Sequence, residues 1–348
     1  MKINTFKAAV LFKQKEKLKI VDLDFPDKLQ KGQALVKIIK FAICGAQINE
    51  INGVKGEDKY LPHLMGHEGY GEIVKTGPFV KKFKKKQKVI LHWRKGSGIN
   101  AKPFTYFSKK FGKINSGQVT TFSQYSVVSE NRLTKFKTKK RYEKFAPLLG
   151  CCLPTAYFLL KKETKINRNQ NLLITGTGGL GLSIAIVAKI KGIKDTTSLD
   201  RTNKSKKIIS DMGFKYLLIK NKKINELIKF KKFDRIIDTS GNNKLISEVF
   251  KLLNDNGELI LVGQPKINTT LKLNNPLKFF SGIKIFASDG GNFEPNNDFK
   301  ELSYIFKKNI KYIKNLVSEV VSLKNVNFGI NKLKQGKAIR IVGDPWIE

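Results

Sequence analysis

The first third of the chain alternates apolar and polar residues with a period of two, which predicts short β-strands. The pattern covers residues 8–12, 18–21 and 32–38, with glycine and proline between the runs. Alternate side chains of a strand face opposite sides of a sheet, so each run offers one face to a core. We therefore predict an antiparallel, barrel-like β domain here, closed by further strands at 89–91 and 121–129.

From residue 171 onward, short apolar runs alternate with segments of helical character. We predict strands at 171–175, 197–199, 216–219, 234–239, 258–263 and 283–287, and helices at 179–190, 204–212, 224–230 and 243–254. Six strands with intervening helices are typical of a doubly wound parallel sheet. The predicted class is α/β with two domains: 1–150 together with 292–348, which carries helices at 302–308 and 326–334, and 151–291.

The net charge of +39 first suggests a protein that binds nucleic acid. The excess is mostly lysine and is spread along the whole chain, whereas nucleic-acid binders concentrate arginine and exposed aromatic residues on one surface. We therefore expect adhesion to polyanions at low salt and no specific nucleic-acid partner. A polyanion-binding protein built on an enzyme scaffold stays open as an alternative.

The chain has only three cysteines, at 44, 151 and 152, which excludes a disulfide framework. No apolar run reaches the roughly 18 residues that cross a bilayer. Residues 1–4 lead directly into the first strand pattern without a secretory segment. These features predict a cytoplasmic protein without a membrane partner.

Three residues far apart in sequence are candidate metal ligands: Cys44, His67 and Cys151. A free cysteine is often only a small buried apolar group, and a histidine is often structural. Together, however, two thiolates and one imidazole make a set that holds a catalytic zinc with its fourth position open. Glu68 follows His67 directly and is expected to act near the metal.

A glycine loop, Gly176-Thr177-Gly178-Gly179-Leu180-Gly181, lies between a predicted strand and a predicted helix. In this context the pattern is a dinucleotide-binding fingerprint. Gly176 permits the tight turn, Gly178 lets the pyrophosphate approach the backbone, and Gly181 lets helix and strand pack closely. The free N–H groups at the start of the helix suit the phosphates.

Asp200 ends the next predicted strand and favours NAD over NADP. A carboxylate at this place accepts hydrogen bonds from the adenosine ribose hydroxyls and repels a 2′-phosphate. Arg201 complicates the choice, because a guanidinium can hold that phosphate. Beside an intact aspartate, we expect Arg201 to lie against the adenine instead.

The spacing Gly66-His67-Glu68, Gly71, Gly77 and Val80 resembles the zinc signature of the medium-chain zinc alcohol dehydrogenases. The resemblance extends to 121–125, 148–151, the glycine loop and 336–340. It implies a GroES-like β-barrel catalytic domain and a Rossmann domain. It also implies one catalytic zinc on Cys44, His67 and Cys151, with Cys152 a bystander, and Arg340 at the cofactor pyrophosphate.

Further implications concern the substrate side and the assembly. Trp93 and His92 stand where relatives line the substrate cleft, and many relatives are homodimers or homotetramers. Relatives often fold a lobe around a second, four-cysteine zinc within 95–119. No cysteine lies between Cys44 and Cys151, so we expect no structural zinc, one metal per chain and a loop held by packing instead.

Three departures from the family concern the surroundings of the metal. Ala46 and Asn49 hold places that start a proton relay in many relatives, so the proton needs another path, through water, a substrate hydroxyl or His92. Gln47 stands where relatives have an aspartate behind the zinc histidine. An amide adds no charge, which predicts a weaker imidazole donor.

The predicted function is therefore NAD-linked, zinc-dependent interconversion of an alcohol and an aldehyde or ketone. The run from His92 to Gly96 resembles dehydrogenases of sugar or cyclitol intermediates. A zinc-free quinone or enoyl reductase of the same superfamily is the alternative within enzymes, but such proteins lack the Cys44, His67 and Cys151 set.

Overall fold

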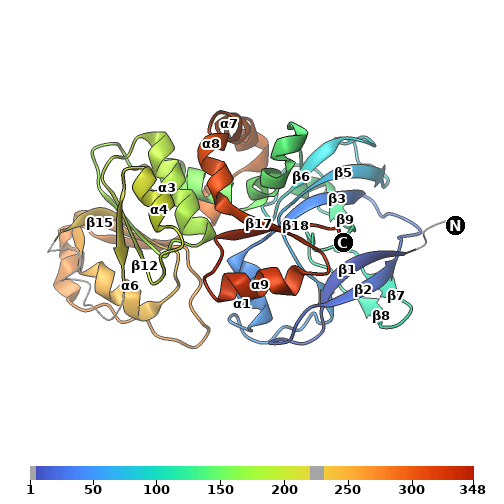
Figure 1. The fold of residues 1–348 in the computed structure, drawn as a ribbon, viewed down its shortest axis with the longest axis horizontal. Coiled ribbons are helices and arrows are strands. Elements are labelled where there is room, and N and C mark those ends of the chain that lie inside the picture. The colour runs from blue at the N-terminus through green and yellow to red at the C-terminus, as the bar shows by residue number, and fades with distance from the viewer. Residues whose placement is uncertain (1–4, 220–230) are drawn as a thin grey trace. The chain divides into compact units, whose positions relative to one another are not determined.

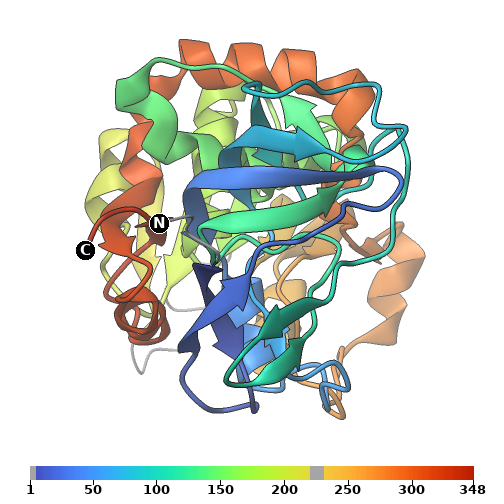
Figure 2. The same cartoon turned by 90° about the vertical axis from the view of Figure 1, so that its right-hand side faces the viewer.

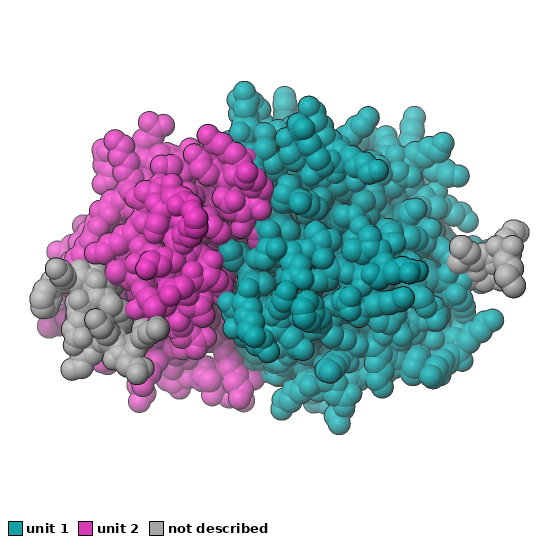
Figure 3. Space-filling view, in the orientation of Figure 1, with its two compact units in different colours: residues 1–151, 294–310, 317–348 teal, residues 152–293, 311–316 magenta. Residues whose placement is uncertain are grey.

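The structure, a computed structural model, describes residues 5–219 and 231–348. It divides into two compact units (Figure 3). Unit 1 comprises Met1–Cys151, Glu294–Ile310 and Val317–Glu348, and unit 2 comprises Cys152–Phe293 and Lys311–Leu316. The division predicted from sequence differs from this one at Cys151, at 292–293 and at 311–316, the last of which belongs to unit 2.

Unit 1 is built around a seven-stranded sheet whose central strand, β3, spans Gln33–Ile43. The strands of this unit are coloured from blue to green and red in Figures 1 and 2. The order is β10-β6-β5-β3-β18-β17, and β9 also pairs with β3. The other bounds are β5 (Gly69–Thr76), β6 (Lys88–Leu91), β9 (Tyr125–Ser129), β10 (Leu133–Lys135), β17 (Val317–Ser322) and β18 (Arg340–Asp344).

Two smaller sheets and several helices complete unit 1. A three-stranded sheet has the order β2-β1-β4, and β7 pairs with β8. The alternating pattern places Phe6, Ala8 and Val10 of β1 in one core with Val21 and Leu23 of β2. The bounds are β1 (Thr5–Leu11), β2 (Lys19–Asp24), β4 (His63–Leu64), β7 (Tyr106–Ser108), β8 (Gly112–Ile114), α1 (Gly45–Ile51), α7 (Pro295–Lys308) and α9 (Val326–Lys334).

Unit 2 contains a six-stranded sheet in the order β13-β12-β11-β14-β15-β16, in which every pair is parallel. This is the doubly wound order, with the first strand of the unit at the point where the order reverses. The bounds are β11 (Leu172–Thr175), β12 (Thr196–Asp200), β13 (Lys215–Leu218), β14 (Phe233–Asp238), β15 (Leu253–Leu261), β16 (Lys284–Ala287), α2 (Cys152–Phe158), α3 (Gly179–Lys191), α4 (Lys206–Asp211) and α6 (Asn243–Phe250). The predicted α/β class is confirmed.

Two predicted elements differ from the structure, and a third lies outside the described residues. The helix predicted over 243–254 is too long, because α6 ends at Phe250 and Leu253 already starts β15. The loop predicted over 95–119 contains the hairpin β7–β8. The helix predicted over 224–230 lies outside the described residues. Within the described ranges, no helix combines the length and apolarity that a bilayer crossing requires.

Candidate functional site

Three neighbouring strands of unit 1 end at the same edge of the sheet and bring the candidate residues together there. Cys44 follows β3, Glu68 precedes β5, and Arg340 is the first residue of β18. The register pairs Phe41 with Gly69 and Ile43 with Ile341, so these strand ends are adjacent. The three strand ends therefore bring together side chains that are far apart in sequence. Cys44 and Arg340, for example, are 296 residues apart.

Cys44, His67 and Cys151 converge at this edge. One potential ligand atom of each lies within 4.8 Å of the other two. Cys44 is the N-cap of α1, and Cys151 ends the 3₁₀ segment Lys140–Gly150. A Cβ on Gly150 would lie 2.9 Å from the Cβ of Glu68, so only glycine allows Cys151 to approach so closely. As whole residues, Cys44, His67 and Cys151 are each half-buried.

The donor atoms of this group suit zinc. His67 Nε2 is buried and, among the described residues, has no hydrogen-bond partner, an arrangement that a metal ion would relieve. Two thiolates and one neutral imidazole compensate the charge of Zn²⁺ and match its preferred ligand types. Cys152 is buried at the start of α2 and does not join the group. The fit is therefore good for one ion.

A hydrogen bond between the sulfurs of Cys44 and Cys151 shifts their pKa values in opposite directions. A hydrogen bond from Cys151 holds the pKa of the Cys44 thiol well below its usual value, helped by the charge of Arg340 and opposed by burial. The same hydrogen bond, together with burial, raises the pKa of Cys151 well above its usual value. Burial acts to lower the pKa of His67, but the neighbouring Cys44 sulfur outweighs it and the net change is a rise.

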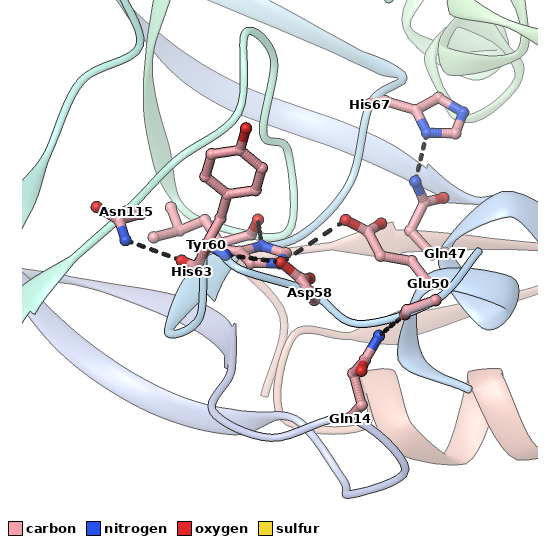
Figure 4. Close-up of polar contacts among 10 residues, drawn as sticks. Gln14, Gln47, Glu50, Asp58, Tyr60, His63, His67 and Asn115 are labelled. Carbon is pink, nitrogen blue, oxygen red and sulfur yellow. Dashed lines mark hydrogen bonds and ion pairs between the residues drawn. The ribbon is translucent and has the colours of Figure 1, made fainter. Parts of the chain in front are cut away.

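Gln47 lies behind the histidine, as the sequence predicts. Its buried side-chain amide nitrogen contacts Nδ1 of His67 (Figure 4), so Nε2 is the ring nitrogen that faces away from Gln47. The backbone N–H of Cys44 donates to Oε1 of the same amide at 3.2 Å. One side chain thus orients two of the candidate metal ligands, in the way that outer-shell partners do in metal sites.

Glu68 and Arg340 are bonded to each other inside unit 1. Nη1 of Arg340 lies 2.5 Å from Oε1 of Glu68 and 3.3 Å from the carbonyl oxygen of Ile43. Both side chains are almost completely buried. The structure thus places Glu68 beside the metal candidates and gives Arg340 a partner there. A contact of Arg340 with a cofactor pyrophosphate stays a prediction.

The glycine loop of unit 2 connects β11 to α3. Gly176 has a φ of +81°, and a Cβ on Gly181 would lie 1.8 Å from the carbonyl oxygen of Gly176. At Gly178, the N-cap of α3, a Cβ would meet nothing within 4 Å, and no side chain caps the helix. Gly179 and Leu180 open the helix itself. The open space at Gly178 and the uncapped helix end suit a pyrophosphate.

Asp200 lies at the end of β12, next to this loop. Its Oδ2 accepts hydrogen bonds from the backbone N–H and hydroxyl of Thr177 at 2.6 and 2.8 Å, and its Oδ1 accepts from Thr202. Burial acts to raise the pKa of Asp200, but these hydrogen bonds hold it below its usual value. Arg201, which follows, is exposed. The carboxylate is therefore charged and fixes the loop.

His92 is placed differently from the expectation. It is fully buried, with Nδ1 2.7 Å from the carbonyl oxygen of Arg94 and Nε2 2.9 Å from the hydroxyl of Thr134. Both nitrogens are used for structure, so we do not carry His92 forward as a cleft or proton-path residue. Trp93 is half-buried, with the guanidinium of Arg94 5.3 Å from its ring centroid.

A second group of potential metal ligands, Glu50, Asp58 and His63, was not singled out from the sequence. They lie close together in the chain: Glu50 is in the last turn of α1, Asp58 is in the segment that follows, and His63 is the first residue of β4. Their closeness in sequence was the signal that could have revealed the group. Hydrophobic periodicity does not show which polar side chains of such a segment contact one another.

Comparison with known proteins gives a consistent result. The "Alcohol dehydrogenase GroES-like domain" family matches residues 30–138, and the "Zinc-binding dehydrogenase" family matches 179–308. The chain is 27% identical to an NAD-dependent alcohol dehydrogenase of Sulfolobus acidocaldarius over 95% of this chain and 97% of the relative. It is 26% identical to alcohol dehydrogenase 6 of Peromyscus maniculatus over 98% of each chain. Benzyl alcohol dehydrogenase of Acinetobacter calcoaceticus has a similar fold, with a TM-score of 0.84, 18% identity and coverage of 98% and 99%.

Proposed function

Because the chain belongs to the medium-chain, zinc-type alcohol dehydrogenase family and is an alcohol oxidoreductase, we propose that it uses one catalytic zinc and NAD. The proposed reaction interconverts an alcohol and an aldehyde or ketone by hydride transfer. The observation that carries the proposal is the convergence of Cys44, His67 and Cys151, one ligand atom of each lying within 4.8 Å of the others.

In this proposal the residues of unit 1 hold the metal and tune it. Cys44 and Cys151 supply the thiolates, so binding of the ion requires both sulfurs to be deprotonated. His67 supplies Nε2, oriented through Nδ1 by Gln47. Zinc, when bound, supplies Lewis acidity that lowers the pKa of an alcohol hydroxyl.

Glu68 and Arg340 add a compensated pair of charges beside the ligands. Arg340 also lowers the pKa of Cys44, so it favours the thiolate that the metal requires. The pair therefore keeps the surroundings of the metal polar and neutral overall. We assign both residues a positioning role toward the ligands.

The residues of unit 2 hold the dinucleotide. The pyrophosphate binds at the N-terminus of α3, in the open space at Gly178. Asp200 accepts hydrogen bonds from the adenosine ribose hydroxyls, which replace the hydrogen bonds that its Oδ1 accepts from Thr202. The nicotinamide, when bound, supplies the hydride acceptor. Arg201 is exposed beside this site and is proposed to lie against the adenine.

The adjacent cysteines offer a matched test of the proposal. Cys151→Ala should abolish both zinc retention after dialysis and NADH formation from an alcohol, whereas Cys152→Ala should keep both. The absorbance of NADH and metal analysis are the readouts. Activity that survives in metal-free Cys151→Ala would instead support a zinc-free reductase.

Substrate, assembly and location are finer parts of the proposal. We propose that the substrate is a small alcohol or carbonyl compound, including sugar and cyclitol intermediates. A panel of simple alcohols, polyols and sugar alcohols tests this.

We also propose that the protein is cytoplasmic and forms a homodimer or homotetramer. Light scattering of the purified protein measures the oligomeric state. If binding to polyanions persisted at physiological salt, the positive charge would have a role of its own.

A further inference from the structure

Glu50, Asp58 and His63 form a compact group of their own in unit 1 (Figure 4). One carboxylate oxygen of each acid and one ring nitrogen of His63 all lie within 4.8 Å of one another. The group contains no cysteine and shares no residue with the Cys44, His67 and Cys151 set. Its chemistry is therefore separate from the proposed catalytic metal.

The orientation of His63 leaves one nitrogen directed at the two acids. Nδ1 lies 2.9 Å from the carbonyl oxygen of Leu64, which can only accept, so Nδ1 carries a hydrogen. Nε2 lies 2.7 Å from Oδ2 of Asp58 and 3.8 Å from Oε1 of Glu50. In a neutral ring, this nitrogen directs its lone pair at two anionic oxygens, so a proton or a cation must lie between them.

A proton satisfies only part of this arrangement. A proton on Nε2 makes a hydrogen bond to Asp58, but Glu50 at 3.8 Å is beyond hydrogen-bonding distance. One positive charge against two carboxylates therefore leaves Glu50 poorly compensated.

A divalent cation satisfies all three groups. With metal–ligand bonds of about 2.0–2.2 Å, neighbouring ligands of a tetrahedral ion lie roughly 3.3–3.6 Å apart. The distances from Nε2 to the two acids, 2.7 and 3.8 Å, lie on either side of this range, and the two carboxylate oxygens lie within 4.8 Å of each other, so small side-chain shifts bring the three atoms onto one ion. Two carboxylates and a neutral imidazole also balance a charge of +2. We propose that Glu50, Asp58 and His63 bind a divalent cation of the zinc class as a structural site.

The surrounding contacts hold the loop between α1 and β4 in place for this role. The backbone N–H of Tyr60 donates to Oδ1 of Asp58 at 2.9 Å, which leaves Oδ2 for the cation. The side chain of Asn115 holds the carbonyl of Tyr60, and that of Gln14 holds the carbonyl of Gly56 (Figure 4). The ligand group is thus built on a fixed backbone.

Burial differs among the three ligands in a way that permits entry. The side chain of His63 is 8% exposed and that of Asp58 12%, whereas that of Glu50 is 40% exposed. An ion reaches the group from the Glu50 side and finds an imidazole nitrogen already buried behind it. The last turn of α1 then becomes tied to β4, which pairs with β1 through His63 and Leu11.

Helix α1 connects this group to the proposed catalytic metal. Gln47 and Glu50 are three residues apart, and Figure 4 shows Gln47 directed at His67 and Glu50 directed at His63. A cation at Glu50 would therefore anchor the helix that orients His67.

Zinc stoichiometry of the full-length protein tests the proposal. Protein is equilibrated by dialysis against a series of buffered free Zn²⁺ concentrations and then analysed for metal. The wild type should bind two zinc ions per chain. Asp58→Asn, His63→Gln and Cys44→Ala should each bind one, and Cys44→Ala/His63→Gln none. Glu57→Gln, which changes the exposed acid beside Asp58, is the matched control and should bind two.

The variants separate this proposal from the proposed function. If only Cys44→Ala binds fewer zinc ions than the wild type, the lost ion belongs to the catalytic site. If only His63→Gln binds fewer, the lost ion belongs to the site of Glu50, Asp58 and His63. We expect His63→Gln to weaken the second zinc by at least about tenfold, the effect that even an outer-shell partner can have. Thermal melts with and without Zn²⁺ verify folding, and Asp58→Asn replaces His63→Gln if the latter does not fold. One zinc per wild-type chain, or two in both His63→Gln and Asp58→Asn, would overturn the proposal.

Discussion

Glu68 and Arg340 are joined by a buried ion pair, with 2.5 Å between Oε1 and Nη1. The pair links the residue after a candidate metal ligand to the first residue of β18. Removing one member takes a hydrogen-bonded opposite charge away from the other inside the protein, which costs about 3–5 kcal/mol in such pairs. We therefore expect Arg340→Met and Glu68→Gln each to lower the free energy of unfolding strongly.

The double variant Glu68→Gln/Arg340→Met checks this interpretation. It should be more stable than the sum of the two single changes implies, because no uncompensated charge remains. Denaturant unfolding of the four proteins measures the coupling. Additive single effects would mean that the two side chains do not stabilise each other.

Two glycines of the cofactor loop should respond differently to alanine. Gly178 has a φ of −68° and open space where the methyl group of an alanine would lie, so Gly178→Ala should fold normally but weaken NADH binding. Gly181→Ala should destabilise unit 2, because its methyl would overlap the carbonyl oxygen of Gly176 at 1.8 Å. Fluorescence titration with NADH and thermal melts distinguish the two effects. Unchanged NADH affinity in Gly178→Ala would place the pyrophosphate elsewhere.

The charge on Asp200 should set the choice of dinucleotide. We expect the wild type to have the higher kcat/KM with NAD, because the charged carboxylate repels a 2′-phosphate. Asp200→Asn keeps the shape and should raise the ratio of kcat/KM for NADP over NAD by roughly tenfold, which corresponds to about 1.4 kcal/mol. Asp195→Asn, a change at an exposed surface acid, is the control. A wild-type preference for NADP would contradict the assignment.

Gln47 should limit how firmly zinc is held. Its one amide oxygen already accepts from the backbone of Cys44, whereas a carboxylate can accept from Cys44 and from Nδ1–H of His67 together. Gln47→Glu should therefore slow zinc release to a chelator, and Gln47→Leu should speed it by about tenfold or more. Equal release rates in all three proteins would show that the contact does not affect the metal.

His92 should make the stability of unit 1 depend on pH. Burial lowers the pKa of His92 to about 4, whereas a histidine in the unfolded chain keeps its usual pKa of 6.5. Between these values the unfolded chain binds more protons, so stability is complete above pH 6.5 and falls as the pH approaches 4. The loss due to this residue is about 3 kcal/mol.

His92→Gln tests the assignment because it removes the titrating group while leaving a polar side chain for Thr134. Its free energy of unfolding should vary less between pH 6.5 and 4 than that of the wild type. The same slope in both proteins would assign the pH dependence to other groups.

Much of the fold could be predicted because its core obeys simple periods. The strands β1 and β11 have the alternating and fully apolar patterns of a one-sided and a buried sheet. The end of α6 was misjudged because Leu252 and Leu253 continue an apolar pattern that suits either element. Short apolar runs do not fix such boundaries.

The candidate site was only partly accessible from sequence. The residue types and spacing indicated Cys44, His67 and Cys151, since few ligand sets suit a catalytic zinc. The partner of Arg340 was not predictable, because the pairing of β18 with β3 joins segments that are distant in sequence. His92 looked functional by position, but its two hydrogen bonds arise from the backbone of Arg94 and the side chain of Thr134.

The sheet of unit 1 can be completed only late in synthesis, because it combines strands from both ends of the described chain. Strand β3 is hydrogen-bonded to β18, which is synthesised after every strand of unit 2. Domains generally fold as units during synthesis. Unit 2 is therefore complete while the sheet of unit 1 still lacks its C-terminal strands. We therefore expect the strand end that carries Cys44 to gain its neighbour only after residue 340 has been made, so the proposed metal ligands would be brought together late in the folding of unit 1.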